Sequence, residues 1–284
     1  MLKLNVLISG STGYIGVQLI KLLVKHPNIN IKYLCGNLSV GKKISFFDKE
    51  LKNQKLPKIV KFKKSYLEKV DLIFSALPNG EAQILSKNLL KHNRLIDLAA
   101  DFRLNDFNEY KKWYKINHKA KNNISKSIYA LSEIYKKDLK KYQIIACPGC
   151  YPTSILLPLI PLLKKKIIFY KNIIIDSKSG YSGGGRSIHK KNIKKNLYDS
   201  LSAYGVGFHR HNSEIQQEIA RVCKKKFEFT FTPHLAPMFR GILSTIYVDA
   251  TANITSKKIL NILKKNYKYN NFIKFAKLND PIST

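Results

Sequence analysis

Cys150 is the residue of this chain best placed to act as a nucleophile. It is followed by Tyr151-Pro152-Thr153-Ser154 and then by an apolar run. Pro152 favours the first turn of a helix, because its missing N–H has no intrahelical partner there. A thiol at a helix N-terminus lies beside unpaired N–H groups and the positive end of the helix dipole, which lowers its pKa. We therefore predict a thiolate at Cys150, on a helix that Pro158 ends or kinks.

Two other interpretations of the cysteines stay open on spacing alone. Cys147 and Cys150 have the Cys-x-x-Cys spacing of a redox dithiol. A thioredoxin-type motif, however, follows the first strands of a small domain, whereas this one follows a complete set of nucleotide-fold elements. Alternatively, both are small buried residues, which is the usual fate of unpaired cysteines.

The second half of the chain offers partners for such a nucleophile. The segment Ser179–Arg186 is rich in glycine, ends in arginine and suits an oxyanion or a phosphate. His209-Arg210-His211, with Glu214 close behind, gathers two imidazoles, a guanidinium and a carboxylate, and His234 and Arg240 lie further on. These contexts favour a Cys–His pair in which a carboxylate orients an imidazole. A metal site at the two neighbouring histidines would lack further ligands.

A glycine-rich turn near the N-terminus predicts dinucleotide binding. Gly10-Ser11-Thr12-Gly13-Tyr14-Ile15-Gly16 joins a β-rich run, Leu4–Ser9, to a helical pattern from Tyr14 to Lys25. One glycine permits the tight turn, one lets backbone N–H groups approach a pyrophosphate, and one lets the helix pack against the strand. The position after a strand and before a helix favours a nucleotide site over an ordinary turn.

The residues after the second strand favour NADP over NAD. NAD-binding versions place an acid there, about 20 residues beyond the turn, for the ribose hydroxyls. Here the second strand runs into Cys35-Gly36-Asn37-Leu38-Ser39, without an acid, and Lys42 and Lys43 follow. Nearby cations suit a 2′-phosphate. Hydroxyls of Ser11, Thr12 and Ser39 could bind phosphate, or each could belong to a solvated turn.

Strands alternate with helices in the first half, which predicts an α/β fold with a Rossmann-type parallel sheet. The helix from Tyr14 has apolar positions Ile15, Leu19, Leu22 and Leu23 at helical spacing. Further elements are expected at Ile31–Cys35 (strand), Val70–Leu77 (strand), Glu81–Lys91 (helix) and Arg94–Leu98 (strand).

Beyond Cys150 the strand-like runs are separated by longer segments, which predicts a second α/β (α+β) domain. Its expected elements are strands at Ile173–Asp176, Phe227–Phe231 and Leu243–Val248 and a helix at Glu214–Cys223. We therefore expect an NADP-binding Rossmann domain at residues 1–149 and a catalytic, substrate-binding and dimerisation domain at residues 150–284.

Composition limits the class of protein. The chain has 284 residues, 44% of them hydrophobic, which is enough for a sizeable core. It has no run long enough to span a membrane and no signal-peptide pattern. Its four cysteines form no disulfide framework. We predict a cytoplasmic protein without a membrane partner.

The formal charge of +33 is unusual, but it does not by itself define a function. The lysines are scattered, often beside Asn and Ile, as codon bias towards A and T would produce. No nucleic-acid-binding motif accompanies them. We therefore expect no nucleic-acid partner. Nucleic-acid binding remains the rival of another class, and it predicts steeply salt-dependent affinity.

Nearly the whole chain resembles the N-acetyl-gamma-glutamyl-phosphate reductases of arginine biosynthesis. The motifs that carry the resemblance are Gly10–Gly16, Ala76–Ala82, Asp97–Leu104, Pro148–Thr153, Ser179–Arg186, His209–Ile215 and Phe231–Met238. The resemblance implies the two-domain fold of semialdehyde dehydrogenases. It also implies NADPH-dependent reduction of an acyl phosphate through a cysteine thioester, and a homo-oligomer, either a dimer or a tetramer.

The same resemblance implies the site residues. Cys150 would be the nucleophile and His209 the acid/base partner. The expected substrate contacts are Arg103, Ser179, Gly180, Arg186, Arg210, His211 and Glu214. The expected cofactor contacts are Gly10, Ser11, Thr12, Gly13, Tyr14, Ile15, Gly16, Ser39 and Pro78.

This chain departs from the family pattern at several positions. Ala99 stands where Ser is usual, Ser132 and Ser213 where Pro is usual, and Tyr181 where a smaller residue is usual. None of these changes removes a group that the mechanism needs. Family members also continue beyond the equivalent of Thr284 with a strand and a helix that return to the nucleotide domain. We therefore expect the sequence to be incomplete.

Rival interpretations keep part of this chemistry or none of it. The same reaction could act on aspartyl phosphate or on a carrier-linked aminoadipyl phosphate. A catalytically inactive remnant is a further alternative.

Overall fold

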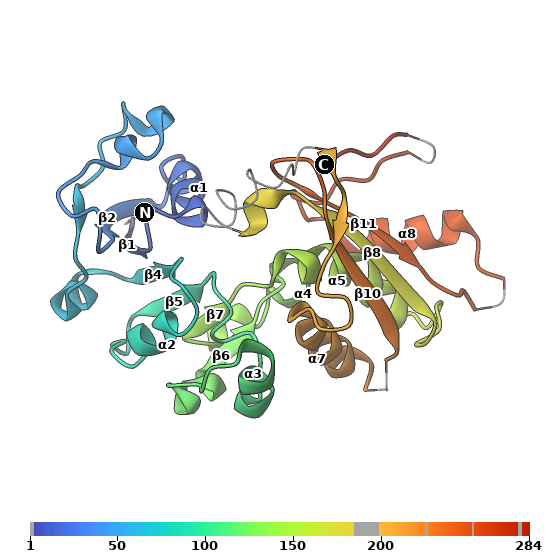
Figure 1. Cartoon of the computed structure of the whole chain (residues 1–284). Coiled ribbons are helices and arrows are strands. Elements are labelled where there is room, and N and C mark those ends of the chain that lie inside the picture. The colour runs from blue at the N-terminus through green and yellow to red at the C-terminus, as the bar shows by residue number, and fades with distance from the viewer. Residues whose placement is uncertain (1–2, 185–198, 225–226, 252, 278–279) are drawn as a thin grey trace. The chain divides into compact units, whose positions relative to one another are not determined.

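The chain forms two compact units. The computed structural model describes residues 3–184, 199–224, 227–251, 253–277 and 280–284 (Figure 1). The units are Met1–Pro148 and Gly149–Thr284, and each is described by itself below. Arg186, predicted to contact substrate, lies outside the described residues.

A parallel sheet forms the centre of the first unit. Its strands lie in the order β3-β2-β1-β4-β5-β7-β6, and every neighbouring pair is parallel. The order β3-β2-β1-β4-β5 is that of a Rossmann fold, in which ligands bind at the carboxyl ends of the strands. The strands are β1 Leu4–Ser9, β2 Ile29–Cys35, β3 Ile59–Val60, β4 Leu72–Ser75, β5 Arg94–Asp97, β6 Ser127–Tyr129 and β7 Ile144–Ala146. The predicted Rossmann-type sheet is confirmed.

Helices cover both faces of this sheet. The α-helices are α1 Tyr14–Leu23, α2 Glu81–Ser86, α3 Phe107–Tyr114 and α4 Ser132–Tyr135. Short 3₁₀ turns occur at Ile44–Phe46, Lys49–Leu51, Lys64–Lys69, Lys121–Lys126 and Leu139–Lys141. The predicted helix from Glu81 ends earlier than expected. The chain turns at Asn93, whose side-chain Oδ1 accepts the N–H of Leu90 at 2.9 Å.

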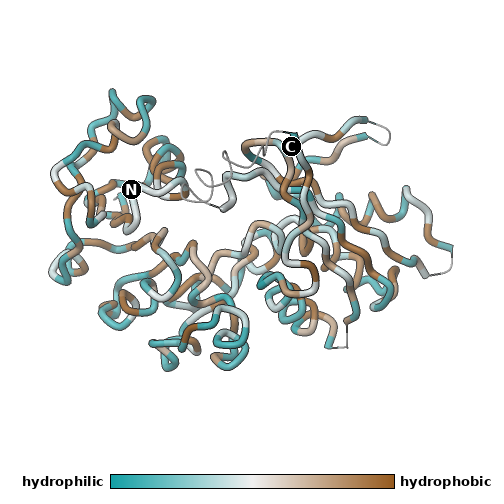
Figure 2. Tube along the Cα trace, viewed as in Figure 1, coloured by the Kyte–Doolittle hydropathy of each residue, from teal (hydrophilic) through white to brown (hydrophobic). Residues whose placement is uncertain are grey.

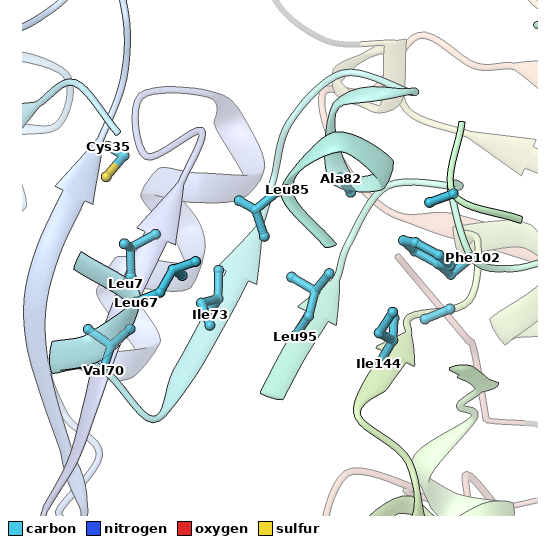
Figure 3. Packing of buried hydrophobic residues seen from close by; sticks show 12 residues of the cluster. Leu7, Cys35, Leu67, Val70, Ile73, Ala82, Leu85, Leu95, Phe102 and Ile144 are labelled. Carbon is cyan, nitrogen blue, oxygen red and sulfur yellow. The ribbon is translucent and has the colours of Figure 1, made fainter. Parts of the chain in front are cut away.

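The core of the first unit lies on the two sides of the sheet. On one side, Leu7, Ile73, Leu95 and Ile144 of adjacent strands pack with Leu85 of α2 (Figure 3). On the other side, α1 covers the residues of β1 that point the opposite way. Burial on both faces explains why these strands are continuous apolar runs rather than alternating ones.

Two of the four apolar positions named for α1 face the core. Leu23 is buried and Leu19 packs against the core, whereas Ile15 and Leu22 are 56% and 70% exposed; the other buried residues of the helix are Gly16, Val17 and Ile20. A Cβ on Gly16 would lie 2.3 Å from the carbonyl oxygen of Gly10. Close packing at this glycine therefore turns its face of the helix inward, and the apolar residues Ile15 and Leu22 remain outside.

The second unit contains a mixed sheet in the order β11-β8-β10-β9. Only the β8–β10 pair is parallel. The strands are β8 Ile173–Ser179, β9 Ser202–Ala203, β10 Phe229–Leu235 and β11 Ile242–Tyr247, and the helices are α5 Cys150–Lys164, α7 His211–Cys223 and α8 Ser256–Asn266. A 3₁₀ turn spans Tyr181–Gly184. Helix α5 packs against α7, α8 and β11 (Figure 1).

The sequence predicted that Pro158 ends or kinks helix α5, and the first alternative is wrong. The helix continues through Pro158 and Pro161 to Lys164. Proline at position 161 cannot donate to the carbonyl of Leu157, four residues earlier. The hydroxyl of Tyr267, just beyond α8, donates to that carbonyl at 2.6 Å instead. A tertiary contact thus supplies a hydrogen bond that the helix itself lacks.

Strand β10 lies later in the chain than the predicted strand, and it includes Pro233. Proline normally argues against a central strand because it cannot donate. Here the carbonyl of Pro233 accepts the N–H of Tyr204 at 3.0 Å, beside the short pairing with β9.

Hydrophilic residues are spread over helices and connections of both units rather than confined to one segment (Figure 2). This distribution agrees with the scattered lysines of the sequence. Within the described ranges, no helix combines the length and the apolar character that crossing a bilayer requires.

Candidate active site

Cys150 is the first residue of α5. Gly149 is the N-cap, with extended backbone, and no side chain caps this helix end. Pro152 lies in the first turn, as predicted. The Cys150 side chain is exposed, and none of the four cysteines forms a disulfide. The predicted placement of the thiol at a helix N-terminus is confirmed.

The surroundings of Cys147 argue against a redox dithiol. Desolvation, together with the neighbouring Asp97 carboxyl, raises the pKa of the Cys147 thiol to about 12. A thiol in this environment remains protonated and is a poor partner for thiol–disulfide exchange.

Glu214 and His211 of α7 hold Gly149 in place. Its N–H donates to Oε2 of the fully buried Glu214 at 2.9 Å. Oε1 of the same carboxylate lies 3.7 Å from Nε2 of His211. A Cβ at position 149 would lie 2.5 Å from that imidazole nitrogen. The carboxylate therefore faces His211 and the residue before the nucleophile.

His209 lies in a cluster of rings from four segments of the second unit. Its imidazole centroid lies 5.4 Å from Tyr151, 5.5 Å from both Tyr204 and Phe231, and 4.7 Å from His211. We call Tyr151, Tyr204, His209, His211 and Phe231 the ring cluster. Tyr151 immediately follows Cys150, so the cluster brings the predicted acid/base residue to the start of α5.

The ring cluster keeps His209 uncharged. Desolvation lowers the pKa of its imidazole to about 4, and the adjacent Arg210 guanidinium acts in the same direction. A neutral imidazole at physiological pH can accept a proton from a thiol. Nδ1 of His209 also accepts the N–H of His211, at 3.3 Å.

Tyr151 and Tyr204 form a hydroxyl bridge. Their oxygen atoms are 3.0 Å apart, and the Tyr151 hydroxyl also lies 3.4 Å from the carbonyl oxygen of His234. Burial raises the pKa of both phenols, while hydrogen bonding with Ser179 acts in the opposite direction. The sequence prediction missed Gly149, Tyr151, Tyr204 and Phe231; the only local signal was the position of two of them beside Cys150.

The other predicted partners are distributed over the second unit. Ser179 is buried at the end of β8. A Cβ on Gly180 would lie 2.7 Å from the backbone of Phe239 and Arg240, so these two loops touch. His234 pairs with Asp176 through Nδ1 and Oδ1 at 3.1 Å, rather than with the ring cluster. Arg210 is exposed at the N-cap of α7.

In the first unit, the glycines of the turn have different steric roles. Gly10 has φ +78°, and a Cβ there would lie 2.3 Å from the carbonyl oxygen of Ala76. The corresponding Cβ on Gly13 has its nearest neighbour at 3.6 Å. Gly10 and Gly16 are thus fixed by internal packing, whereas a Cβ on Gly13, the N-cap of α1, would make only an ordinary contact.

Ser11 anchors the turn to the end of β2. Its N–H and its hydroxyl both donate to the carbonyl of Cys35, at 3.1 and 3.0 Å. Its contact with a phosphate stays a prediction, as do those of Thr12 and of the N-terminal residues of α1, Tyr14 and Ile15. Gly36 lies beside Thr12, and Ser39 is buried in the turn that follows.

The loop after β4 is organised by Asp101, another residue that the predicted sites missed. This fully buried carboxylate accepts the N–H of Gly80 at 2.6 Å, that of Ala82 at 3.0 Å and the Tyr110 hydroxyl at 2.7 Å. It thereby shapes the turn that begins at Pro78.

Arg103, predicted to bind substrate, has backbone partners. Its Nε donates to the carbonyl of Cys147 at 2.8 Å and Nη2 to that of Leu98 at 3.3 Å. Its contact with substrate stays a prediction. No group of three or more metal-binding side chains occurs in the part of the chain that the structure describes.

Comparison with known proteins defines the class. Residues 5–142 match the family model "Semialdehyde dehydrogenase, NAD binding domain", and residues 150–284 match "Semialdehyde dehydrogenase, dimerisation domain". The fold is similar to aspartate semialdehyde dehydrogenase II of Vibrio cholerae, with a TM-score of 0.68 at 15% identity over 94% of this chain and 80% of that chain. The Candida albicans enzyme with NADP gives 0.59 at 16% identity, over 93% of this chain and 76% of that one. The protein is an enzyme of the semialdehyde dehydrogenase class.

Curated relatives narrow the class to a family. The chain is 41% identical over 284 residues to the N-acetyl-gamma-glutamyl-phosphate reductase of Alkaliphilus metalliredigens, covering 98% of this chain and 80% of that protein. It is 40% identical to a probable chloroplastic N-acetyl-gamma-glutamyl-phosphate reductase of Arabidopsis thaliana, covering 93% of this chain and 66% of that protein. The chain belongs to the N-acetyl-gamma-glutamyl-phosphate reductase family.

Proposed function

We propose that this protein reduces N-acetyl-gamma-glutamyl phosphate to N-acetyl-glutamate semialdehyde and phosphate, with NADPH, as a step in arginine biosynthesis. The observation that carries the proposal is Cys150 at the uncapped N-terminus of α5, in the same unit as an uncharged His209. Curated relatives that are 40% and 41% identical to this chain are named N-acetyl-gamma-glutamyl-phosphate reductases.

Cys150 supplies the nucleophile. Its sulfur attacks the γ-carbonyl carbon of the acyl phosphate, and the bond from carbon to the phosphate oxygen breaks, which leaves a thioester on Cys150. The first N–H groups of α5, which have no intrahelical acceptor, would stabilise the oxyanion of this step. The loops at Gly180 and Arg240, together with Arg210, are the candidates for holding the anionic groups of the substrate.

His209 moves the protons. Its neutral imidazole takes the thiol proton as the sulfur attacks, and the resulting imidazolium returns it to the departing phosphate. His209 would then take a proton from solvent and donate it to the carbonyl oxygen when the thioester is reduced to a thiohemiacetal. When the thiohemiacetal collapses, its hydroxyl proton passes to the leaving sulfur, which regenerates the Cys150 thiol and releases the semialdehyde.

The first unit fits a dinucleotide. Gly13 lies at the N-cap of α1, where no side chain caps the helix, and the first turn of that helix contains no acid. These features suit a pyrophosphate. The end of β2 lacks an acid and is followed by Ser39 and Lys42, which supports NADP rather than NAD. A bound NADPH would supply the hydride for reduction of the thioester.

The test runs the reaction in reverse, with purified full chain, N-acetyl-glutamate semialdehyde, NADP and phosphate. Cys150→Ala should abolish NADPH formation, while the matched variant Cys223→Ala should retain it. Turnover by Cys150→Ala would exclude the mechanism. A parallel assay with aspartate semialdehyde and a carrier-linked aminoadipate semialdehyde separates the related substrates, and faster turnover of either one would reassign the substrate.

We further propose a homo-oligomer, a dimer or tetramer, built through residues 150–284, which match a dimerisation domain. Light scattering of the purified protein tests it. The absence of disulfides among the four cysteines supports a reducing compartment such as the cytoplasm.

A further inference from the structure

Tyr204 belongs to none of the motifs that carry the family resemblance, yet it contacts both sides of the proposed catalytic pair. Its ring meets the His209 imidazole edge-on, at 5.5 Å between centroids and 72° between planes. Its hydroxyl lies 3.0 Å from the hydroxyl of Tyr151, the residue after Cys150. Tyr204 therefore contacts the acid/base residue and the neighbour of the nucleophile at once.

The backbone of Tyr204 is fixed. Its N–H donates to the carbonyl of Pro233 in β10 at 3.0 Å, and the preceding residue, Ala203, pairs with His234 across the β9–β10 ladder. The phenol therefore extends from a backbone attached to the sheet. A side chain anchored in this way can hold another group in place, since its own position costs little further entropy.

Tyr151 gives the hydroxyl bridge a rigid second end. Its ring is only 2% exposed and packs at 5.2 Å on Phe231 and 5.8 Å on His211. A hydrogen bond between two anchored phenols sets the separation between the start of α5 and the segment that precedes His209. The bond joins the two phenols directly, whereas the ring packing around them is less directional.

The charged and titratable groups that face His209 come from several elements. Tyr151 faces it from α5 and His211 from α7, Tyr204 faces it from the segment after β9, and Arg210 is its chain neighbour. The nonpolar Phe231 of β10 closes the remaining side at 5.5 Å. Tyr204 is the most exposed aromatic of this ring cluster, at 38%, so its ring separates the imidazole from solvent.

We propose that Tyr204 is a positioning residue for the reaction: its hydroxyl fixes the distance between the Cys150 and His209 segments, and its ring shields the imidazole from water. The proposal rests on the proposed function, because the distance matters only if these two residues act together. The hydroxyl and the ring of Tyr204 make separate contributions. Tyr204→Phe removes only the hydroxyl, whereas Tyr204→Leu removes the ring.

The first experiment is a double-mutant cycle on the full-length enzyme. Tyr204→Phe and Tyr151→Phe should each lower kcat about 3- to 10-fold, the effect of one neutral hydrogen bond, with little change in KM. Tyr151→Phe also removes the contact with the His234 carbonyl, so the double variant should be no slower than Tyr151→Phe, because the shared bond is then already lost. Wild-type kcat in Tyr204→Phe, or losses that multiply in the double variant, would overturn the proposal.

Tyr267→Phe is the matched control. It also removes a tyrosine hydroxyl that binds α5, at the Leu157 carbonyl, but remote from the ring cluster in sequence. It should lower thermal stability and leave kcat at the wild-type value. An equal loss of kcat in this control would show that any weakening of α5 slows the enzyme, and the positioning role would be withdrawn.

The second experiment tests the shielding by the ring. It measures the pKa of the His209 imidazole by NMR titration, and the signals of this imidazole are assigned by comparison with His209→Gln. Tyr204→Leu removes the ring, so the pKa of His209 should rise from about 4 towards the ordinary 6.5, whereas Tyr204→Phe should leave it low. Equal pKa values in the two variants would refute the shielding role. This measurement needs no turnover, so it remains decisive if wild-type protein fails the assay and the proposed function falls.

Discussion

Gly149 lies against the imidazole of His211 so closely that a Cβ at position 149 would come within 2.5 Å of Nε2. The backbone of Gly149 has φ −63°, which any residue adopts, so glycine is needed here for space and not for conformation. A methyl group would push the ring, the Glu214 carboxylate or the start of α5 aside. The side chain of His211 thus limits the size of the residue before the nucleophile.

Gly149→Ala should therefore destabilise the protein by about 1–3 kcal/mol, the usual cost of overpacking, and abolish most activity. Urea unfolding and the reverse assay measure the two effects. Adding His211→Ala should restore stability by removing the colliding ring, without restoring activity. A Gly149→Ala protein as stable as wild type would show that the ring moves freely.

The glycines of the N-terminal turn should respond differently to alanine. Gly16→Ala places a Cβ 2.3 Å from the Gly10 carbonyl oxygen and should lower the free energy of unfolding by about 1–3 kcal/mol. Gly13→Ala meets nothing closer than 3.6 Å, so stability should be retained while NADP binds more weakly. Thermal unfolding with and without NADP separates the effects, because a ligand that binds the folded state raises the melting temperature more when it binds more tightly. A wild-type NADP shift in Gly13→Ala would remove that residue from the cofactor site.

Burial of His209 predicts a pH dependence of stability. Its folded-state pKa is about 4, below the ordinary 6.5, so between these values the unfolded chain binds a proton that the folded chain does not. The free energy of unfolding should fall as pH falls through this window. Denaturant titrations across this pH window should show that the free energy of unfolding depends less on pH in His209→Gln than in wild type. His92 is exposed, so the control His92→Gln should keep the wild-type pH dependence. Parallel curves for wild type and His209→Gln would contradict the low pKa.

Asp97 should give stability the opposite dependence on pH. It is fully buried, and desolvation together with the neighbouring Asp101 carboxyl raises its pKa from 3.8 to about 7. Among the described residues, its Oδ2 has no hydrogen-bond partner. The folded state therefore binds the proton more tightly, and stability contributed by the neutral form is lost as pH rises through about 7.

Asp97→Asn removes this ionisation and keeps the shape of the side chain. The variant should match wild type below about pH 3.8, gain on it as pH rises, and exceed it by up to about 4 kcal/mol above pH 7. Urea unfolding at the two ends of this range measures the difference. If the difference in unfolding free energy between Asp97→Asn and wild type becomes smaller as pH rises, the buried carboxyl ionises without a cost in stability.

Local signals explain the parts of the site that the sequence predicted. Cys150 and Pro152 lie within three residues of each other, and the proline defines a helix start whatever packs around it. The alternation of strands with helices and the glycine turn are likewise encoded within short segments. These features need no knowledge of distant residues, so one sequence was enough to predict them.

The ring cluster depends on contacts that no local pattern reveals. Tyr151 and Phe231 are far apart in the chain and meet only because α5 packs on the mixed sheet. The exposure of Ile15 and Leu22 on α1 likewise depends on a contact between segments, because close packing at Gly16 turns the face with Val17 and Ile20 inward. Similarly, the continuation of α5 past Pro158 depends on its tertiary packing rather than on its own propensity.

The hydroxyl of Tyr267 completes a hydrogen bond that Pro161 cannot make. If an ordinary residue replaced that proline, its own N–H would reach the Leu157 carbonyl, and the phenol would become redundant. The two positions should therefore covary among homologues: lineages that lose the proline are free to lose the tyrosine, whereas those that retain it should keep a donor at position 267.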